Sequence, residues 1–369
     1  MSEVRSEALD VMRGVTLALM IVVNMAVGDG VSYGQLLHAQ WDGLTLTDLV
    51  FPSFLFVVGG ALAHTLAGYR AQSGLHLAGR VITRAAVIFL LGVLLSLFPF
   101  VTHSPDGQLT LVSLAQARIP GVLQRIALCY GLAALVVRLG NRRFVAAVLA
   151  GSLVGYAVLL DAFGDRTLAG NAVLRLDRWV FGDAHLYHGE GIAFDPEGLL
   201  SSLPALANVL AGYLAVSFVR RRAATYQSVA TLWLVATLVI LAALGWSASL
   251  PFNKKLWTSS YALLNVGIDT AAFALLVQVI DLRRWRGLVP LAAPFGRNTL
   301  LIYLLSEIGN VVLLETQVGS TSLFDWLWRT AFASWAGEKF GGLLYSVAYL
   351  LLFWLLAREL DRRRLYVRV

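Results

Sequence analysis

Three polar side chains lie around one short connection near the start of the chain, and their types suit the movement of protons. Asn24 ends a first apolar stretch, Asp48 begins a second, and His38 lies between them. An imidazole titrates near neutral pH, so His38 can take a proton from a nucleophile and return one to a leaving group. Asp48 can fix the ring tautomer and stabilise its protonated form, as in catalytic triads.

Each of these residues also has a role that involves no chemistry. A histidine in a loop can simply be solvated. An aspartate at a helix N-terminus can cap the helix or compensate its dipole, and Asn24 can make an interhelical hydrogen bond. The meeting of His38 with Asp48 at one connection favours the catalytic interpretation.

The elements that hold these residues are predicted to be membrane helices. Hydrophobic residues make up 58% of the chain, charged residues 14%, and the mean hydropathy is +0.72, which exceeds what a soluble domain of 369 residues carries. A helix of roughly 20 apolar residues crosses the hydrocarbon layer, where backbone amides must be paired. Ten stretches qualify: residues 9–28, 47–68, 81–100, 120–138, 144–161, 199–219, 228–248, 258–280, 290–315 and 341–357. The prediction is one all-α integral membrane domain over residues 1–369.

Basic residues predict which side each connection occupies, because cytoplasmic loops retain Lys and Arg. Nineteen of the 29 lie at the two ends of the chain and at every second connection: Arg5, Arg13, Arg70, Arg80, Arg84, Arg138, Arg142, Arg143, Arg220, Arg221, Arg222, Arg283, Arg284, Arg286, Arg358, Arg362, Arg363, Arg364 and Arg368. The opposite connections hold acidic residues instead. Both termini are therefore predicted to be cytoplasmic and His38 to face outward, with residues 162–198 forming an ordered outer cap.

Two further features narrow the class of protein. The basic balance is explained by this rule and by anionic lipid, so no nucleic acid is expected. The single cysteine, Cys129, lies in an apolar stretch and is predicted to fill space, with no disulfide framework and no cysteine metal site. Glu7, Asp10 and Arg13 stand where a cleaved signal peptide would turn apolar, so the first stretch is expected to remain as a helix.

Charged residues inside the stretches are costly in hydrocarbon and by default face the bundle interior or a watery cavity. Arg118 and Arg125 are seven residues apart, close to two helical turns, so they are predicted to point the same way. A buried guanidinium needs an anion, either a carboxylate or a phosphate-bearing ligand. The same reasoning marks Asn265, Asp269, Arg297, Asn298 and Glu307. Lys254 and Lys255 lie in an outer connection, where a solvated loop is the favoured interpretation and binding of an anionic substrate is the alternative.

Six segments resemble, in order, the transmembrane part of heparan-alpha-glucosaminide N-acetyltransferase and its bacterial relatives. They are "LDVMRGVTLALMIVVN", "HAQWDGLTLTDLVFPSFLFVVG", "RIPGVLQRIALCY", "FDPEGLLSSLP", "PFNKKLWTSSYAL" and "GRNTLLIYLLSE". The resemblance covers almost the whole chain, and its second segment is the most specific.

The resemblance implies transfer of an acetyl group from cytoplasmic acetyl-CoA to the amine of a glucosamine-type sugar on the outer, periplasmic side of a bacterial inner membrane. The resemblance places the catalytic histidine of the family on His38 and its polar neighbours on Asp48 and Asn24. Of these, Asn24 would donate a hydrogen bond to the carbonyl oxyanion. The residues expected to bind acetyl-CoA are Arg13, Arg125, Arg297 and Asn298. Those expected to bind the acceptor are Trp41, Asp42, Lys254 and Asp269.

The residues leave several alternatives open. His38 either deprotonates the sugar amine for direct attack or accepts the acetyl group and passes it on. A proton-coupled or substrate transporter and an O-acyltransferase acting on a cell-envelope glycan are the alternative functions. The expected partners are acetyl-CoA, an amino-sugar or glycan acceptor and the lipid bilayer, a homodimer is left open, and no metal is expected.

Overall fold

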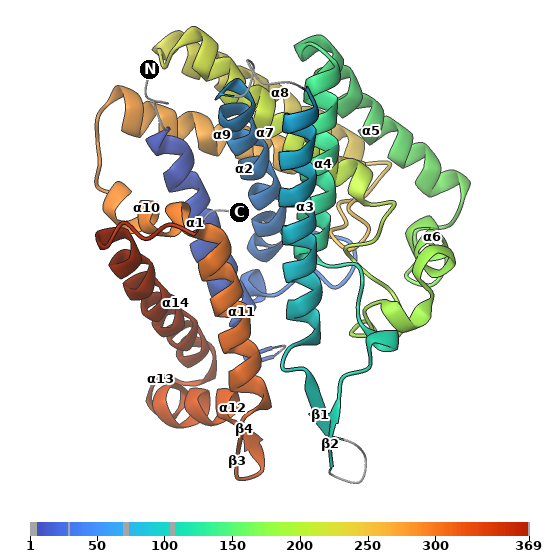
Figure 1. Ribbon diagram of the computed structural model, residues 1–369, viewed down its shortest axis with the longest axis vertical. Coiled ribbons are helices and arrows are strands. Elements are labelled where there is room, and N and C mark those ends of the chain that lie inside the picture. The colour runs from blue at the N-terminus through green and yellow to red at the C-terminus, as the bar shows by residue number, and fades with distance from the viewer. Residues whose placement is uncertain (1–5, 29, 69–73, 104–107, 368–369) are drawn as a thin grey trace.

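The computed structural model describes residues 6–28, 30–68, 74–103 and 108–367, and it is built almost entirely of helices (Figure 1). Within these residues, single long helices cover nine of the ten predicted stretches. They are α1 (Glu7–Asn24), α2 (Leu46–Gly68), α3 (Gly74–Leu97), α4 (Val122–Leu139), α5 (Arg142–Ala162), α7 (Ser202–Arg222), α8 (Tyr226–Ser247), α9 (Ser259–Leu276) and α14 (Glu338–Arg362). The remaining stretch, residues 290–315, is divided into α10 (Val289–Arg297) and α11 (Thr299–Glu315).

The predicted helical membrane class is confirmed. Among the described residues, eight helices are long and apolar enough to cross a membrane, and a ninth span results if α10 and α11 count as one. α1 coincides with the first predicted stretch, but it carries Glu7, Asp10 and Arg13 and is not among the eight. The number ten and the side of each terminus therefore stay predictions.

The prediction of one continuous helix over residues 290–315 is wrong. α10 and α11 meet at an angle of 84°. Asn298 leaves the helical conformation between them, and its side chain instead donates to the Leu365 carbonyl and accepts from the Val367 N–H. The end of α10 lies against α1 at Gly296, where only a glycine fits, because a Cβ there would lie 2.0 Å from the Asp10 carbonyl oxygen of α1.

The centre of the bundle is held by close helix crossings. A Cβ added to Gly59 of α2 would lie 1.7 Å from the Val209 carbonyl oxygen of α7, and one added to Gly212 of α7 would lie 1.8 Å from that of Phe56. Glycines permit this because they let two backbones touch, a common device where lipid supplies little force to join helices. The close crossing with α7 therefore fixes the position of α2.

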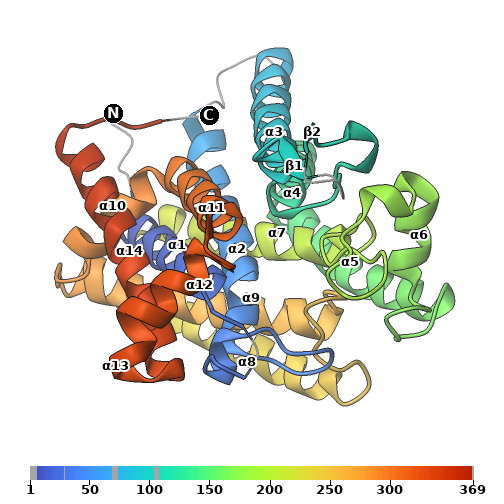
Figure 2. The same ribbon diagram turned by 90° about the horizontal axis from the view of Figure 1, so that it is seen from below.

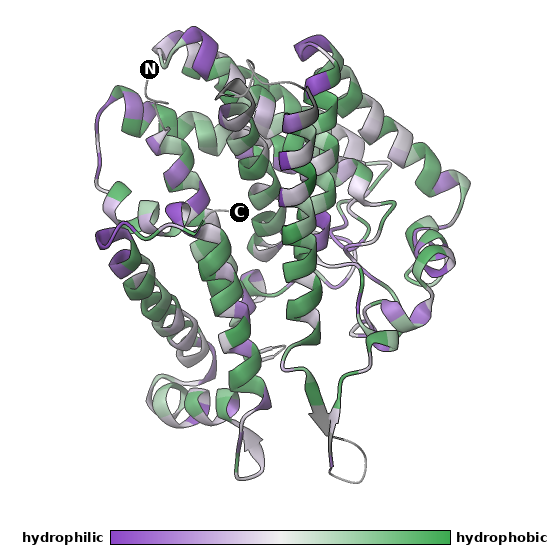
Figure 3. Ribbon diagram, in the orientation of Figure 1, coloured by the Kyte–Doolittle hydropathy of each residue, from purple (hydrophilic) through white to green (hydrophobic). Residues whose placement is uncertain are grey.

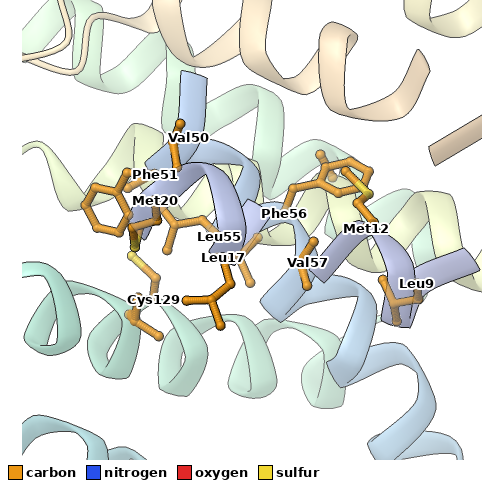
Figure 4. Close-up of a cluster of buried hydrophobic side chains, with 14 of the residues drawn as sticks. Leu9, Met12, Leu17, Met20, Val50, Phe51, Leu55, Phe56, Val57 and Cys129 are labelled. Atoms are coloured by element: carbon orange, nitrogen blue, oxygen red, sulfur yellow. The ribbon is translucent and has the colours of Figure 1, made fainter. Parts of the chain in front are cut away.

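Apolar side chains fill the space beside this crossing. Leu17 and Met20 of α1 lie with Phe51 and Leu55 of α2 and with Cys129 of α4 (Figure 4). Cys129 is a free, fully buried thiol. The space-filling role predicted for this cysteine is confirmed.

Residues 162–198 pack around a second hydrophobic cluster, separate from the central one. They contain α6 (Ala172–Phe181) and the short helix η3 (Asp183–His185). Val173 and Phe194 of this segment share the cluster with Tyr156 of α5 and with Leu256, which precedes α9. The segment is thus anchored to two neighbouring parts of the chain.

Smaller elements complete the fold and were not predicted. They are η1 (Gly34–Leu36), the antiparallel pair β1 (Val101–His103) and β2 (Leu109–Leu111), η2 (Leu114–Gln116), the π-helical turn η4 (Val277–Leu282), the pair β3 (Gln317–Val318) and β4 (Thr321–Ser322), α12 (Leu323–Leu327), the π-helical turn η5 (Trp328–Ala333) and α13 (Ser334–Ala336). The two β pairs and α12–α13 lie at the lower end of Figure 1.

Hydropathy follows the ribbon in the way a membrane bundle requires. Hydrophobic residues cover the helices, and hydrophilic ones gather in connections and near helix ends (Figure 3). The arginine-bearing connections α4–α5 and α7–α8 lie at the upper end of Figure 1. Arg5, Arg70 and Arg368, which entered the charge count, lie outside the described residues.

Candidate active site

His38 and Asp48 form a direct pair. Nδ1 of His38 lies 2.7 Å from Oδ1 of Asp48. The Asp48 side chain is fully buried, whereas 48% of the His38 side chain is exposed. Because Nδ1 is held by the carboxylate, Nε2 is the ring nitrogen left for proton transfer or nucleophilic attack. The sequence prediction that these two residues lie together is confirmed.

Asp48 also organises the backbone around the histidine. Its Oδ2 accepts from the Ala39 N–H at 3.2 Å and from both the N–H and the hydroxyl of Thr45 at 2.9 Å. The return of this first-turn carboxylate to the Thr45 N–H resembles a capping box. Helix cap and ring orienter, two roles that the sequence allowed to coexist, are therefore combined in one carboxylate.

Aromatic rings support the pair from the other side. Tyr261 of α9 donates from its hydroxyl to the Asp48 carbonyl oxygen and contacts Trp257 edge to face. Trp257 also contacts Phe51, one turn along α2, and lies under the Arg125 guanidinium at 4.8 Å from ring centroid to Cζ. The segment that carries Trp257 and Tyr261 was singled out in the sequence, but neither ring was assigned a role.

Asn24 pairs with a different carboxylate. Its Nδ2 donates to Oε1 of Glu307 on α11 at 2.7 Å, and its carbonyl oxygen accepts from Asn310. The structure thus joins His38 with Asp48, and Asn24 with Glu307. An interhelical bond was one of the two interpretations for Asn24, and the oxyanion role stays a prediction.

The outer connection is tied to two other segments. Trp41 donates from its indole N–H to the Arg166 carbonyl at 3.0 Å, and Asp42 accepts from the side chain of Asn253 at 3.1 Å. These two residues were predicted to bind the acceptor. Both line a loop whose position is fixed by residues 162–198 and by the loop that precedes α9.

Lys254 and Lys255 are not solvated, which corrects the interpretation favoured from sequence. Their side chains are only 12% and 14% exposed. Nζ of Lys254 lies 3.7 Å from Glu197, and Nζ of Lys255 lies 2.5 Å from Glu190. The folding of residues 162–198 onto this loop buries both ammonium groups against carboxylates.

Arg118 and Arg125 both reach residues 195–201, but Arg118 precedes α4, so the helical spacing from which this was predicted does not apply. Arg118 donates twice to Asp195 at 2.8 Å and to Glu197 at 2.6 Å. Burial would raise the pKa of Glu197, but the Lys254 ammonium and the Arg118 guanidinium hold it well below its usual range. Arg118 thus has the carboxylate partners expected of a buried arginine.

Arg125 is satisfied differently. Its Nη2 donates to the carbonyls of Pro196 and Gly198 and to the Ser201 hydroxyl. These acceptors are neutral oxygens, and Nε and Nη1 have no hydrogen-bond acceptor among the described residues. Arg125 is therefore a buried cation, 2% exposed, with donors to spare.

One buried acid in this region escaped the sequence analysis. Asp177 of α6 is fully buried and accepts from the Leu199 N–H at 2.8 Å. Burial raises the pKa of Asp177 to about 7, against the opposing hydrogen bond from Leu199 and with added repulsion from Asp195. No spacing in the sequence distinguishes this aspartate from its solvated neighbours.

Three residues predicted to bind acetyl-CoA gather at the α10–α11 bend. Arg13 donates to the Gly296 carbonyl at 3.2 Å, Arg297 donates to both carboxylate oxygens of Asp361 at 2.8 Å, and Asn298 holds residues near the end of the chain. The fourth, Arg125, lies apart from them beside Trp257. The predicted donor site is thus divided between two regions.

Asp269 faces the bundle interior, as expected for a charged residue in a span. It is 2% exposed, and its Oδ1 accepts from Ser53 of α2 at 2.5 Å. Its Oδ2 and Oδ1 of Asn265, one turn earlier on α9, have no hydrogen-bond donor among the described residues. In the part of the chain that the structure describes, no group of three or more His, Cys, Asp or Glu is arranged for a metal ion.

Comparison with known proteins identifies relatives of this chain. The family model for the catalytic part of heparan-alpha-glucosaminide N-acetyltransferase matches residues 5–178, which include His38 and Asp48. The human enzyme of that name is 28% identical over 82% of this chain, and the mouse enzyme is 26% identical over 99%. The chain spans 53% and 60% of these relatives, somewhat more than half of their length. The resemblance predicted from the six segments is confirmed.

Proposed function

We propose, from the premise that this chain is a relative of the heparan-alpha-glucosaminide N-acetyltransferases, that it transfers an acetyl group from cytoplasmic acetyl-CoA to the amine of a glucosamine-type sugar on the outer side of the membrane. The observation that carries the proposal is the 2.7 Å contact between His38 and the buried carboxylate of Asp48. A half-exposed imidazole oriented by a buried carboxylate is the arrangement that acyl transfer requires.

In the direct route, Nε2 of His38 takes a proton from the neutral sugar amine as the amine nitrogen attacks the thioester carbonyl carbon. The new C–N bond forms, the C–S bond breaks, and the proton passes from His38 to the departing CoA thiolate. Asp48 stabilises the imidazolium that exists between these proton transfers. The products are an N-acetyl sugar and CoA, and His38 is neutral again.

In the covalent route, Nε2 of His38 attacks the thioester carbonyl carbon, the C–S bond breaks and CoA leaves as the thiolate, which gives an acetyl-imidazolium. The sugar amine then attacks the acetyl group, the bond from the acetyl carbon to Nε2 breaks, and the proton that the amine loses passes through Nε2 to the CoA thiolate. The bond from Nδ1 to Asp48 serves both routes, because it fixes which nitrogen is presented. Trapping of labelled acetyl on His38 in the absence of acceptor distinguishes the covalent route from the direct one.

Asn24 is proposed to bind the oxyanion in either route. A side-chain amide carries two N–H groups, and Glu307 accepts from Nδ2 of Asn24. A second N–H on the same nitrogen is therefore compatible with donation to the thioester oxygen. Each such donor is worth roughly 10²–10³ in rate in acyl-transfer enzymes.

The phosphates of acetyl-CoA are proposed to bind at the α10–α11 bend. Arg13 and Arg297 supply cations there, and the first N–H groups of α11 follow Asn298. Anions are favoured at helix N-termini and by arginine forks. The acceptor is proposed to contact Trp41, Asp42, Lys254 and Asp269.

The decisive experiment is acetyl transfer from acetyl-CoA to glucosamine by the purified protein in lipid nanodiscs. His38→Ala is expected to lower the rate by about a thousandfold, within the roughly 10²–10⁴ contributed by a positioned acid–base group. His188→Ala, which alters an exposed histidine in the segment of residues 162–198, is the matched control and is expected to keep the wild-type rate. Wild-type activity in His38→Ala would reject the proposal.

A transporter is the second candidate, and one observation favours it. The bend between α10 and α11, the one bent pair of this kind in the described chain, resembles the discontinuous helices that form substrate sites in secondary transporters. Solute movement into sealed proteoliposomes without acetyl-CoA would support this function. An acceptor panel that includes glycans lacking an amine tests the O-acyltransferase alternative.

A further inference from the structure

A groove opens between α3 and α4. Its volume is about 710 Å³, within the roughly 300–1,000 Å³ typical of small-molecule sites. Apolar residues at helical spacing line both sides, from Leu77 to Phe89 on α3 and from Ala127 to Leu135 on α4. From Gln124 to Arg138 the groove follows α4 for about 21 Å at 1.5 Å per residue, a large part of the hydrocarbon layer of about 30 Å.

This groove faces the surrounding lipid. α3 and α4 stand side by side in both views (Figures 1 and 2), and Figure 2 shows α3 at the edge of the bundle. Only 17% of the apolar window of α3 is buried, and Ile82, Phe89 and Leu135, which line the groove, are large exposed hydrophobic residues. A molecule can therefore enter sideways from the membrane.

The two ends of the groove differ in chemistry. Arg138 lies at one end, whereas Arg125, Glu197 and Ser202 line the other. Arg125 is almost completely buried, and its Nε and Nη1 lack an acceptor among the described residues. A hydrocarbon alone would satisfy the apolar walls but leave these donors unused. The groove is suited to an amphipathic molecule with an oxygen-bearing head at the Arg125 end.

The Arg125 end adjoins the proposed active site. The Arg125 guanidinium lies on the ring of Trp257, which contacts Tyr261 edge to face. Tyr261 in turn donates to the backbone of Asp48, the partner of His38. Two aromatic rings thus stand between the outer end of the groove and the catalytic pair.

We propose that the acceptor is a lipid: a glucosamine-type head group carried on a hydrocarbon chain, with the chain lying in the α3–α4 groove and the head extending from its Arg125 end around Trp257 and Tyr261 to His38. This inference rests on the proposed function and names its substrate class. The pantetheine arm of acetyl-CoA fits less well, because its two amides would face hydrocarbon without partners. The chemical step is unchanged, with C–N bond formation, C–S cleavage and transfer of the amine proton through His38 to CoA.

The test compares two acceptors with the same amine, methyl glucosaminide and dodecyl glucosaminide, by mass analysis of acetylated product in nanodiscs. Dodecyl glucosaminide is expected to have a kcat/KM at least about tenfold higher, the gain from burying roughly two methylene groups in the groove. Partitioning of the dodecyl chain into the membrane also raises the dodecyl-to-methyl ratio of kcat/KM values. Variants that fill the groove separate this effect from binding in the groove.

Gly131→Phe fills the groove. A Cβ on Gly131 would lie 4.0 Å from that of Ala85 across the groove, so a side chain there enters without a backbone clash. Gly151→Phe on α5 is the matched control, because Gly151 is exposed with no atom within 4 Å of an added Cβ. The dodecyl-to-methyl ratio is expected to fall at least about fivefold in Gly131→Phe relative to Gly151→Phe, since both experience the same partitioning.

Each other outcome has a definite meaning. Equal ratios in the two variants would overturn the lipid acceptor and leave the proposed function standing. A raised KM for acetyl-CoA in Gly131→Phe, with an unchanged acceptor ratio, would place the donor in the groove and also overturn the inference. No acetylation of either acceptor by the wild type would reject the proposed function and the inference with it. If Gly131→Phe fails to fold, Leu135→Trp on the exposed rim replaces it under the same criterion.

Discussion

The His38–Asp48 pair and the α10–α11 bend are both polar sites in an apolar bundle, yet they are assembled in opposite ways. His38 and Asp48 are ten residues apart in the chain and lie on one loop and the helix turn that follows it. At the bend, Arg13 reaches a carbonyl 283 residues away, and Arg297 reaches a carboxylate 64 residues away. A local site keeps its geometry through its own turn, whereas a distant one depends on how α1, α10 and α14 pack together.

The largest test of this contrast is Asp48→Asn. The variant keeps the shape of the side chain but removes the charge that stabilises the His38 imidazolium, so kcat for acetyl transfer is expected to fall by about a thousandfold. Initial rates at saturating acetyl-CoA measure it. Asp325→Asn, which alters a first-turn aspartate of α12, is the control for lost helix capping. A twofold or smaller change in Asp48→Asn would show that the carboxylate serves only the fold.

At the bend, Arg297→Gln is expected to act on binding rather than on chemistry. Loss of one charge-assisted contact to a phosphate raises KM for acetyl-CoA by about tenfold while kcat changes little. Arg286→Gln removes a basic residue that pairs with Glu7 at 3.5 Å on the surface, and it is expected to leave KM unchanged. A fall in kcat with constant KM in Arg297→Gln would remove the bend from the donor site.

The smallest effect on activity is expected from a change that concerns stability beside the outer site. The folded pKa of Asp177 is raised to about 7 by burial, so between about pH 4 and pH 7 the unfolded chain releases a proton that the folded chain retains. The free energy of unfolding therefore falls as pH rises through this window. Asp177→Asn is expected to be more stable than the wild type at pH 8 by up to about 4 kcal/mol, at about 1.4 kcal/mol per pKa unit, and equally stable near pH 4.

Thermal unfolding of the two proteins in detergent from pH 5 to pH 8 measures this difference. Asp165→Asn is the control of opposite sign, because hydrogen bonds from Thr167 lower the pKa of that exposed carboxyl. Its stabilising contribution is present at neutral pH and is lost as pH falls. A pH-independent difference between Asp177→Asn and the wild type would mean that Asp177 does not titrate in this range.

The same contrast explains what could be predicted from the sequence. Nine helices and the His38–Asp48 contact depend on hydrophobic runs and on a short separation, both of which are visible in one dimension. The break at Asn298 depends on bonds to Leu365 and Val367, and no local pattern reveals them. The burial of Lys254 depends likewise on a fold that brings Glu197 against it.

The aromatic support of the site was hidden for a related reason. Trp257 and Tyr261 are four residues apart at the start of a membrane span, where rings are common at the interface. Only the packed structure shows Trp257 between Arg125 and Phe51. Sequence reasoning detects charged and polar residues, which are costly in lipid, but it does not single out aromatic residues, which are common in membrane helices.

The bonds from Asn298 to Leu365 and Val367 have a practical consequence for work on this protein. They hold residues 365–367 against the junction between α10 and α11. A fluorescent protein or purification handle fused after these residues would strain the two hydrogen bonds, and activity measured with it would differ from activity measured with the same handle at the amino end. The position of a tag is thus itself a probe of whether this junction moves during turnover.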